Sequence, residues 1–133
     1  MAVPGAALAA SSGTVDESFT VNNVLTLTLS TSTINYGTLD PGQTSAGQSV
    51  TAHASGNVGW RLSVSGTAFT SAGNTMPATA RQRDGINFVD GVELQNSATG
   101  AAADTTTVWT VAVPATQKGG TYTGTLTYSL SSY

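Results

Sequence analysis

Four side chains with oxygen ligands recur at every third position in the middle of the chain: Asp84, Asn87, Asp90 and Glu93. Carboxylate and amide oxygens in a loop are the ligands that Ca²⁺ takes in extracellular β-proteins. The spacing differs from that of an EF-hand, and a calcium site needs six or more oxygens where four are visible. The segment therefore has two interpretations, a calcium site or a plain polar hairpin, and the count of oxygens favours the hairpin. No other cofactor is expected.

Residues for nucleophilic or acid–base catalysis are scarce. His53 is the only histidine, and cysteine is absent. His53 shares its parity with Thr51 and Ser55, which predicts a solvated position on the hydroxyl face of a strand. The two glutamates, Glu17 and Glu93, have no spacing that would make them face each other as a glycosidase pair. Catalysis needs a nucleophile beside a base, so we expect no catalytic residues and no enzyme activity.

Two further groups of side chains have both a binding and a structural interpretation. Arg81 and Arg83 beside Asp84 form a small charged group, for which a surface ion pair is favoured over an acidic partner. Trp60 and Trp109 would suit sugar stacking, but both lie on the apolar parity of their segments. That parity favours packing in the core.

Composition excludes several classes of partner. The formal net charge is −3, and charged residues make up 8% of the chain. The four Lys and Arg residues cannot form the basic surface that nucleic acid or an anionic membrane requires. No apolar run approaches the roughly 20 residues of a membrane-spanning helix. We therefore expect neither nucleic-acid binding nor a membrane span.

The elements that carry these residues are β-strands. Between Gly119 and Tyr133 hydrophobic and hydroxyl residues alternate, and Leu25, Leu27 and Leu29 alternate with hydroxyl residues in the same way. A period of two indicates a strand with one face on a core and the other in water, and no helical repeat is present. The sequence predicts one all-β domain over residues 15–133, a single antiparallel β-sandwich or jelly roll of about eight or nine short strands.

Turn signals divide this domain into segments. Asp40-Pro41-Gly42 is a strong turn, whereas Ser55-Gly56-Asn57 and Asp90-Gly91 each suggest a hairpin between the flanking strands. The predicted strands are Val24–Ser30, Thr33–Leu39, Ser49–Ser55, Trp60–Ser65, Ile86–Val89, Val92–Leu94, Thr107–Val113 and the stretch from Gly119 to the last residue.

The N-terminal region differs from the rest. Residues 1–14 are small and without periodicity, and we expect a flexible arm; Ala7-Leu8-Ala9 within it has the look of a signal-peptidase site. Val15, Phe19 and Val21 then share one parity, and Glu17 is the odd member of that face. This stretch has strand character but is separated from the next strand by Asn22-Asn23.

Two blocks of sequence resemble secreted microbial surface proteins. One joins residues 34–42 (INYGTLDPG) to residues 59–66 (GWRLSVSG), and the other runs from Val113-Pro114 to residues 119–127 (GGTYTGTLT). The combination is similar to spore-coat-U-like pilins of archaic chaperone–usher pili, to TasA/camelysin-type and archaeal bundling-pilus subunits, and to WxL-type domains. The chain differs from the first group in having no cysteine and from the last in having one Trp-x-Leu.

The resemblance implies an extracellular, cell-surface subunit that polymerises by donor-strand exchange, in which one subunit completes the sheet of the next. Residues 15–30 supply the candidate donor, with these interface side chains: Val15, Phe19, Val21, Val24, Leu25, Leu27 and Leu29. The expected partners are identical subunits in a homopolymer. The alternatives are a monomeric carbohydrate-binding or adhesive module that binds through the loops of residues 66–104, and a closed shell.

Overall fold

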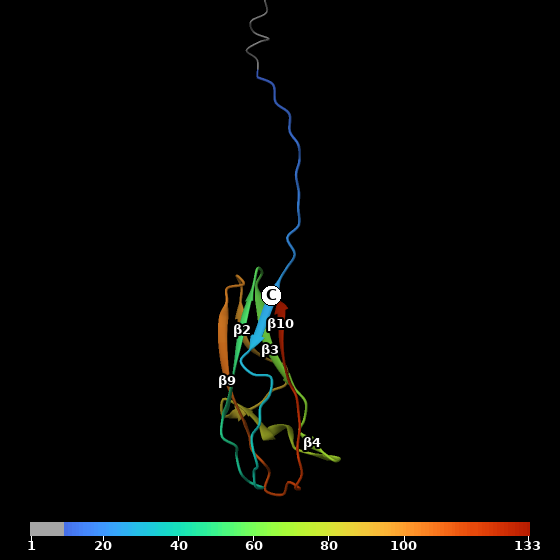
Figure 1. Ribbon diagram of the computed structural model, residues 1–133, viewed down its shortest axis with the longest axis vertical. Coiled ribbons are helices and arrows are strands. Elements are labelled where there is room, and N and C mark those ends of the chain that lie inside the picture. Colours follow the sequence, from blue (N-terminus) through green and yellow to red (C-terminus); the bar gives the residue numbers. More distant parts are fainter. Residues whose placement is uncertain (1–9) are drawn as a thin grey trace, which may run out of the picture.

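Two antiparallel sheets packed face to face form the body of the protein (Figure 1). The computed structural model describes residues 10–133, so the signal-like Ala7-Leu8-Ala9 lies outside the described residues. The five-stranded sheet has the order β1 (Leu25–Leu29), β2 (Gln48–Gly56), β9 (Ala103–Val111), β6 (Arg81–Arg83) and β7 (Ile86–Asn87). The three-stranded sheet has the order β10 (Leu126–Ser132), β3 (Trp60–Gly66) and β8 (Val92–Ser97). The prediction of an all-β sandwich is confirmed.

Small elements connect the two sheets at one end. A two-stranded ribbon consists of β4 (Thr70–Ser71) and β5 (Asn74–Thr75), and a single 3₁₀ turn, η1, spans Ala78–Ala80. Within residues 10–133 no helix has the length and apolar character to cross a membrane.

The core follows the period-two pattern of the sequence. Alternate residues of β2, β3 and β9 are buried between the sheets, and Trp60 and Trp109 have no exposed surface. The indole of Trp109 packs edge-on against Phe88 with ring centroids 5.3 Å apart. The prediction that both tryptophans belong to the core, and not to a sugar-binding surface, is confirmed.

Both predicted hairpins are wrong. β2 and β3 belong to different sheets, because Ser55-Gly56-Asn57 carries the chain across the sandwich and not back along the same sheet. Asp90-Gly91 likewise leads from the five-stranded sheet into β8 of the other sheet. The strands on either side of Ser55-Gly56-Asn57 bury their apolar faces against opposite sides of the core, whereas Ile86 and Val89 before Asp90 are exposed. Periodicity alone does not reveal to which sheet a strand belongs.

The real Asp-Gly hairpin joins β6 to β7. Asp84 and Gly85 both have positive φ angles, 50° and 82°, as the two central residues of a type I′ turn require. Asp84 also accepts a hydrogen bond from the backbone N–H of Val108 at 2.8 Å, which anchors the turn to β9. The sequence of β6, Arg-Gln-Arg, has no alternation, and this strand was not predicted.

Two predicted strands are absent or shortened on one side of the sandwich. Residues 33–39 form no strand, and the C-terminal strand begins only at Leu126, so that residues 119–125 make an isolated bridge between Thr123 and Thr70. The Asp40-Pro41-Gly42 turn is confirmed, with the Gln43 N–H bonded to the Asp40 carbonyl at 3.0 Å. Both stretches thus have the alternating sequence of a strand but lack the continuous backbone hydrogen bonds of one.

We expect a large loss of stability when a methyl group is added at Gly100. Its φ is +86°, and a Cβ would stand 2.5 Å from the Val58 carbonyl oxygen and 2.7 Å from that of Gly56. Gly100→Ala should lower the free energy of unfolding by about 3 kcal/mol or more, since backbone atoms must move. Gly73, with φ +85° and open space around it, is the matched control. Gly73→Ala should cost only the roughly 1–2 kcal/mol of a left-handed residue, and equal losses in urea titrations would contradict this account.

Candidate functional site

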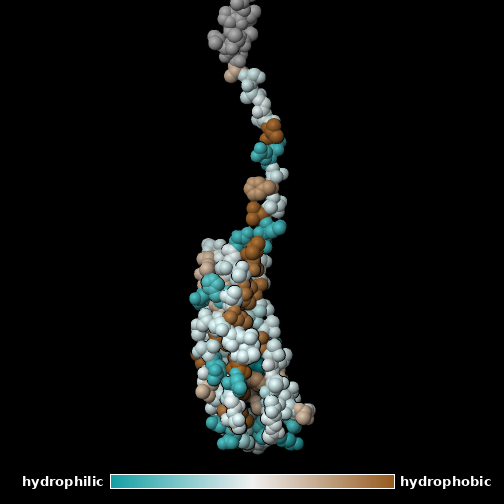
Figure 2. Space-filling model, viewed as in Figure 1, coloured by the Kyte–Doolittle hydropathy of each residue, from teal (hydrophilic) through white to brown (hydrophobic). Residues whose placement is uncertain are grey.

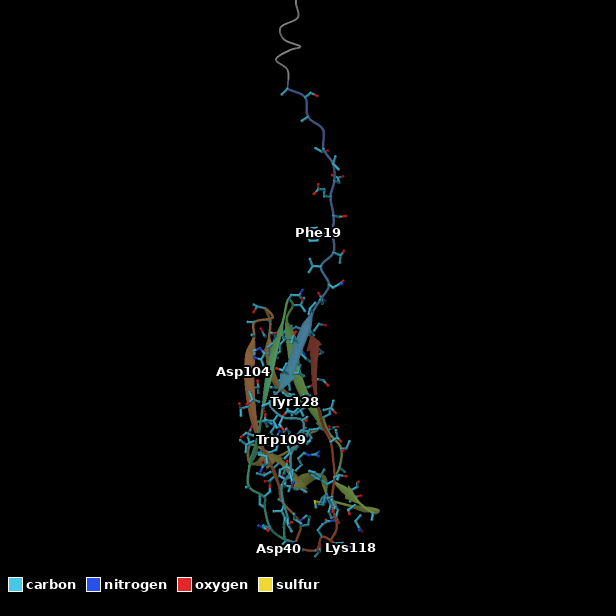
Figure 3. All side chains as sticks on the ribbon, in the orientation of Figure 1. Phe19, Asp40, Asp104, Trp109, Lys118 and Tyr128 are labelled. Carbon is cyan, nitrogen blue, oxygen red and sulfur yellow. The ribbon has the colours of Figure 1, made fainter. Side chains whose placement is uncertain are left out.

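A groove of about 850 Å³ opens where the two predicted strands are missing. One wall is the segment of residues 31–39, which follows β1, and the other is the segment of residues 117–126, which leads into β10 (Figure 1). The groove runs from Tyr128 in the middle of the body towards the end marked by Asp40 and Lys118 in Figure 3.

The floor of this groove is the lower part of the hydrophobic core. Val50, Met76 and Val111 are buried core residues, and all three line the groove. The walls add half-buried apolar side chains, among them Ile34, Tyr36, Leu39, Tyr122 and Leu126. Such a recess in a small sandwich leaves apolar surface without a cover, which is typical of a binding site for an apolar segment.

The 117–126 wall offers backbone groups to the groove. The backbone N–H and C=O groups of Thr123 exchange hydrogen bonds with those of Thr70, and the Thr125 carbonyl accepts one from the Thr67 N–H. The backbone polar groups of these two odd-numbered residues therefore point away from the groove, towards the segment of residues 67–70. Tyr122 and Gly124 form no backbone–backbone bond with residues 10–133. Because N–H and C=O groups alternate in direction along an extended chain, those of Tyr122 and Gly124 face the groove.

The opposite wall has no ladder either. Segment 31–39 forms no backbone–backbone hydrogen bond within the described range and is held by local side-chain bonds. Asn35 Oδ1 accepts from the Gly37 N–H at 2.8 Å, and Thr31 Oγ1 accepts from the Thr33 N–H at 3.3 Å. Both edges of the groove therefore resemble sheet edges with one strand missing between them.

Arg81 places a positive charge in the groove. Its side chain is 5% exposed, and Nη1 donates to the Thr67 carbonyl at 2.7 Å. The guanidinium stacks on Phe69 at 4.4 Å from the ring centroid. Buried Nε has no hydrogen-bond partner among residues 10–133, and the described part of the chain gives Arg81 no ion pair. The prediction of a surface position is wrong for Arg81.

The charged side chains that line the groove have one sign. Among residues 10–133 its charged lining residues are Arg81 and Lys118, and no Asp or Glu of this range lines it. Burial lowers the pKa of Arg81, and the nearby Tyr36 and Asp90 oppose this shift; a guanidinium stays charged at neutral pH in either case. Burial raises the pKa of Tyr36, so this wall contributes a neutral phenol. The groove is an apolar recess with a cationic floor.

Tyr128 closes the inner end of the groove and stabilises the core. Its hydroxyl accepts a hydrogen bond at 3.0 Å from Nε1 of the buried Trp109, and burial raises its pKa. Tyr128→Phe should lower the free energy of unfolding by about 1–3 kcal/mol, because the indole N–H keeps its burial and loses its acceptor. Tyr133→Phe is the control, since Tyr133 is exposed and its expected effect is within about 0.5 kcal/mol. Chemical denaturation of both variants checks this, and equal stabilities would contradict it.

The N-terminal arm, residues 10–23, extends away from the body on the side opposite the open end of the groove (Figures 1 and 3). Its side chains are all exposed, including Phe19 at 90% and Val15 at 86%. Figure 2 shows hydrophobic residues in brown and tan along the arm, between polar ones in teal and white. Asn57 fixes the root of the arm, since its amide nitrogen donates to the Asn22 carbonyl and its Oδ1 accepts from the Val24 N–H, both at 2.8 Å.

No family model matches this chain. Searches of curated proteins and of solved structures also found no match. The resemblance to pilus-type subunits stays a prediction, and the functional argument depends on the groove and the arm.

The predicted donor region is divided between two environments. Val15, Phe19 and Val21 lie on the free arm, and Val24 lies at its root. Leu25, Leu27 and Leu29 belong to β1, which pairs along its whole length with β2 of the same chain. Leu25 and Leu27 pack on the core, so this strand already has a place in its own sandwich. Only residues 15–21 of the predicted region are free to reach a neighbour.

The four predicted calcium ligands do not gather. Asp84 binds the Val108 N–H, Asp90 binds the Gly66 N–H at 2.9 Å, and Glu93 lies 3.7 Å from Nε of Arg61. Asn87 ends β7 in the other sheet from Glu93. Within residues 10–133 no three His, Cys, Asp or Glu side chains form a metal-binding group. Asp84 and Asp90 hold turns in place, but the polar hairpin predicted around Asp90-Gly91 is wrong, and the Asp-Gly hairpin in this region is the one at Asp84-Gly85.

Of the remaining polar residues, His53 lies at the surface and Arg83 is half-buried. His53 is half exposed and contacts Asp104 across the β2–β9 pair, and Arg83 lies 3.7 Å from Asp84. The groove itself was not predicted from the sequence. The available signal was that residues 33–39 and 119–125 alternate like strands. Among residues 10–133, segment 33–39 has no hydrogen-bonded neighbour, and segment 119–125 has one on one side only.

Proposed function

We propose that this protein is a structural subunit of an extracellular filament that polymerises by donor-strand exchange, with residues 15–21 of one copy inserted in the groove of the next. The observation that carries this proposal is the coexistence in one chain of a strand-length groove and an unpaired strand-like arm. The groove has room for an extended segment between its two walls, and the arm is extended and has alternating apolar side chains, which supports insertion of the one in the other.

The arm suits the groove in pattern and in charge. Val15, Phe19 and Val21 recur with a period of two, so an extended arm presents all three to the apolar floor. Residues 10–23 carry two acidic side chains, Asp16 and Glu17, and no basic one. The described residues that line the groove include two cationic and no anionic side chains. Arm and groove are therefore complementary in hydrophobicity and in sign of charge.

The positions of arm and groove support an open chain of subunits. The arm leaves beside the C-terminus, whereas the groove opens towards the other end of the body (Figure 1). A contact between two different surfaces at opposite ends is heterologous, and when the rotation does not close it produces a filament. Seven inserted residues would span about 23 Å of the groove.

Insertion would also complete the ladder. β10 runs from the groove end towards the C-terminus, so an arm that enters from the neighbour below runs antiparallel to residues 119–126. It would then offer partners to Tyr122 and Gly124 on one edge. No step of this assembly requires catalysis or a cofactor.

Electron microscopy of the purified full chain tests the proposal. We expect unbranched fibres of one subunit width at micromolar concentration. Dispersed monomers at high concentration would contradict the proposal and favour a monomeric binding module. Closed particles would also contradict it, since they require an interface that closes on itself.

A further inference from the structure

Arg81 and Glu17 are each a charged residue among apolar ones. Arg81 is a buried cation among apolar groove residues, with an unpartnered Nε. Glu17 is the one charged residue on the arm face that carries Val15, Phe19 and Val21. If that face enters the groove, Glu17 enters with it, because side chains two residues apart point the same way. A buried carboxylate is tolerated where a cation meets it.

Building on the proposed function, we infer that Glu17 of the incoming arm forms an ion pair with Arg81 of the receiving subunit and thereby fixes the register of the inserted strand. Asp16, on the opposite face, stays in solvent. The hydrophobic residues alone define the register weakly, since Val15, Phe19 and Val21 could shift by two positions and still face the floor.

The place of Arg81 along the groove defines that register. Its Nη2 lies 2.8 Å from the point where a Cβ on Gly124 would stand, and the absent side chain leaves room for the guanidinium. A carboxylate that reaches this guanidinium comes from the arm residue directly opposite Gly124. In the antiparallel arrangement Glu17 is then opposite Gly124, and Phe19 is opposite Tyr122.

Asp90, a carboxylate of the same subunit near Arg81, does not form an ion pair with it. Asp90 raises the pKa of Arg81 through space, but Oδ1 of Asp90 accepts the Gly66 N–H at 2.9 Å and forms no ion pair with the guanidinium. The Thr67 carbonyl satisfies only Nη1. The guanidinium therefore retains donor groups for a second acceptor, and a carboxylate binds such a planar group in a defined direction.

Disulfide cross-linking between engineered cysteine pairs measures the register directly. The sequence contains no cysteine, so no native thiol can form a competing disulfide. With Glu17 opposite Gly124, Ser18 is opposite Thr123. This pair is of the non-hydrogen-bonded type, whose Cα atoms approach to about 4.5 Å, within the range of a disulfide. Chains carrying Ser18→Cys with Thr123→Cys should become covalent ladders on a non-reducing gel. Ser18→Cys with Thr121→Cys or with Thr125→Cys, two positions away, should give at least about tenfold less product.

Charge variants provide the second readout. Glu17→Gln should raise the critical concentration for assembly about tenfold or more, as expected when one partner of a buried pair is lost. Asp16→Asn removes the same charge from the outer face and should change it less than about twofold. Both residues lie on the arm, outside the folded body, so neither change affects folding of the sandwich.

The outcomes separate this inference from the proposed function. Ladders that form preferentially with Thr121→Cys or Thr125→Cys, or equal effects of Glu17→Gln and Asp16→Asn, would overturn the ion pair while fibres still form. A wild-type chain that stays monomeric would overturn the donor-strand assembly itself. A disulfide formed within single chains would show that the arm fills its own groove, which also overturns the assembly.

Discussion

Replacing Phe19 by aspartate should abolish fibre formation without affecting the fold of the subunit. Phe19 is 90% exposed and contacts no core residue of its own chain, so the monomer loses nothing. In the assembled state the change removes a buried aromatic ring and places a carboxylate against apolar residues. The combined cost is about 4 kcal/mol or more, which corresponds to about a thousandfold weaker association. Sedimentation and electron microscopy at matched concentrations measure the loss.

Ser18→Asp is the matched control for this experiment. It adds the same charge one residue away, on the face that points out of the groove, and should leave fibres intact. If Phe19→Asp assembles like the wild type, residues 15–21 are not the donor. Side-chain changes are preferable to a deletion of residues 1–30, because that deletion would also remove β1 and its pairing with β2.

Assembly should raise thermal stability by a large and concentration-dependent amount. The groove walls of each free subunit carry apolar side chains that are only half-buried, and an inserted arm would cover them and complete the hydrogen-bond ladder. A ligand present at a thousand times its dissociation constant stabilises the folded state by about 4 kcal/mol. For a domain of this size we expect polymeric wild type to melt at least about 10 °C above the monomeric Phe19→Asp variant.

Scanning calorimetry over a range of protein concentrations measures this difference. The melting temperature of the polymer should rise with concentration, whereas that of the Phe19→Asp monomer should stay constant. Ser18→Asp should follow the wild type. Equal melting temperatures for fibres and monomers would mean that the groove is not what the assembly fills.

The sequence predicted the β-sandwich because its strands carry their own signal. Trp60, Leu62 and Val64 alternate with polar residues, and such a pattern needs no knowledge of the neighbours. The pairing of strands was less predictable. Ser55-Gly56-Asn57 suits a hairpin locally, and the structure uses it to cross between the sheets because both flanking faces bury against the same core.

The site was only partly predictable for a related reason. Residues 33–39 have the sequence pattern of a strand, but a strand also requires a hydrogen-bonded partner, and residues 10–133 provide none for this segment. The sequence predicted Arg81 to be a surface residue beside Arg83 and Asp84. Its burial follows from the position of β6 at the groove floor, which depends on contacts with residues far away in the sequence, such as Thr67.

Asn57 fixes the direction in which the arm leaves the body, and this direction would affect how a filament grows. Because the arm and the recess occupy opposite extremities of each subunit, a string of them is directional. One terminus would display a free tail and the other a vacant hydrophobic trough. Elongation at the two termini would therefore proceed at different rates, and a small apolar peptide added in solution would cap one terminus and leave the other active.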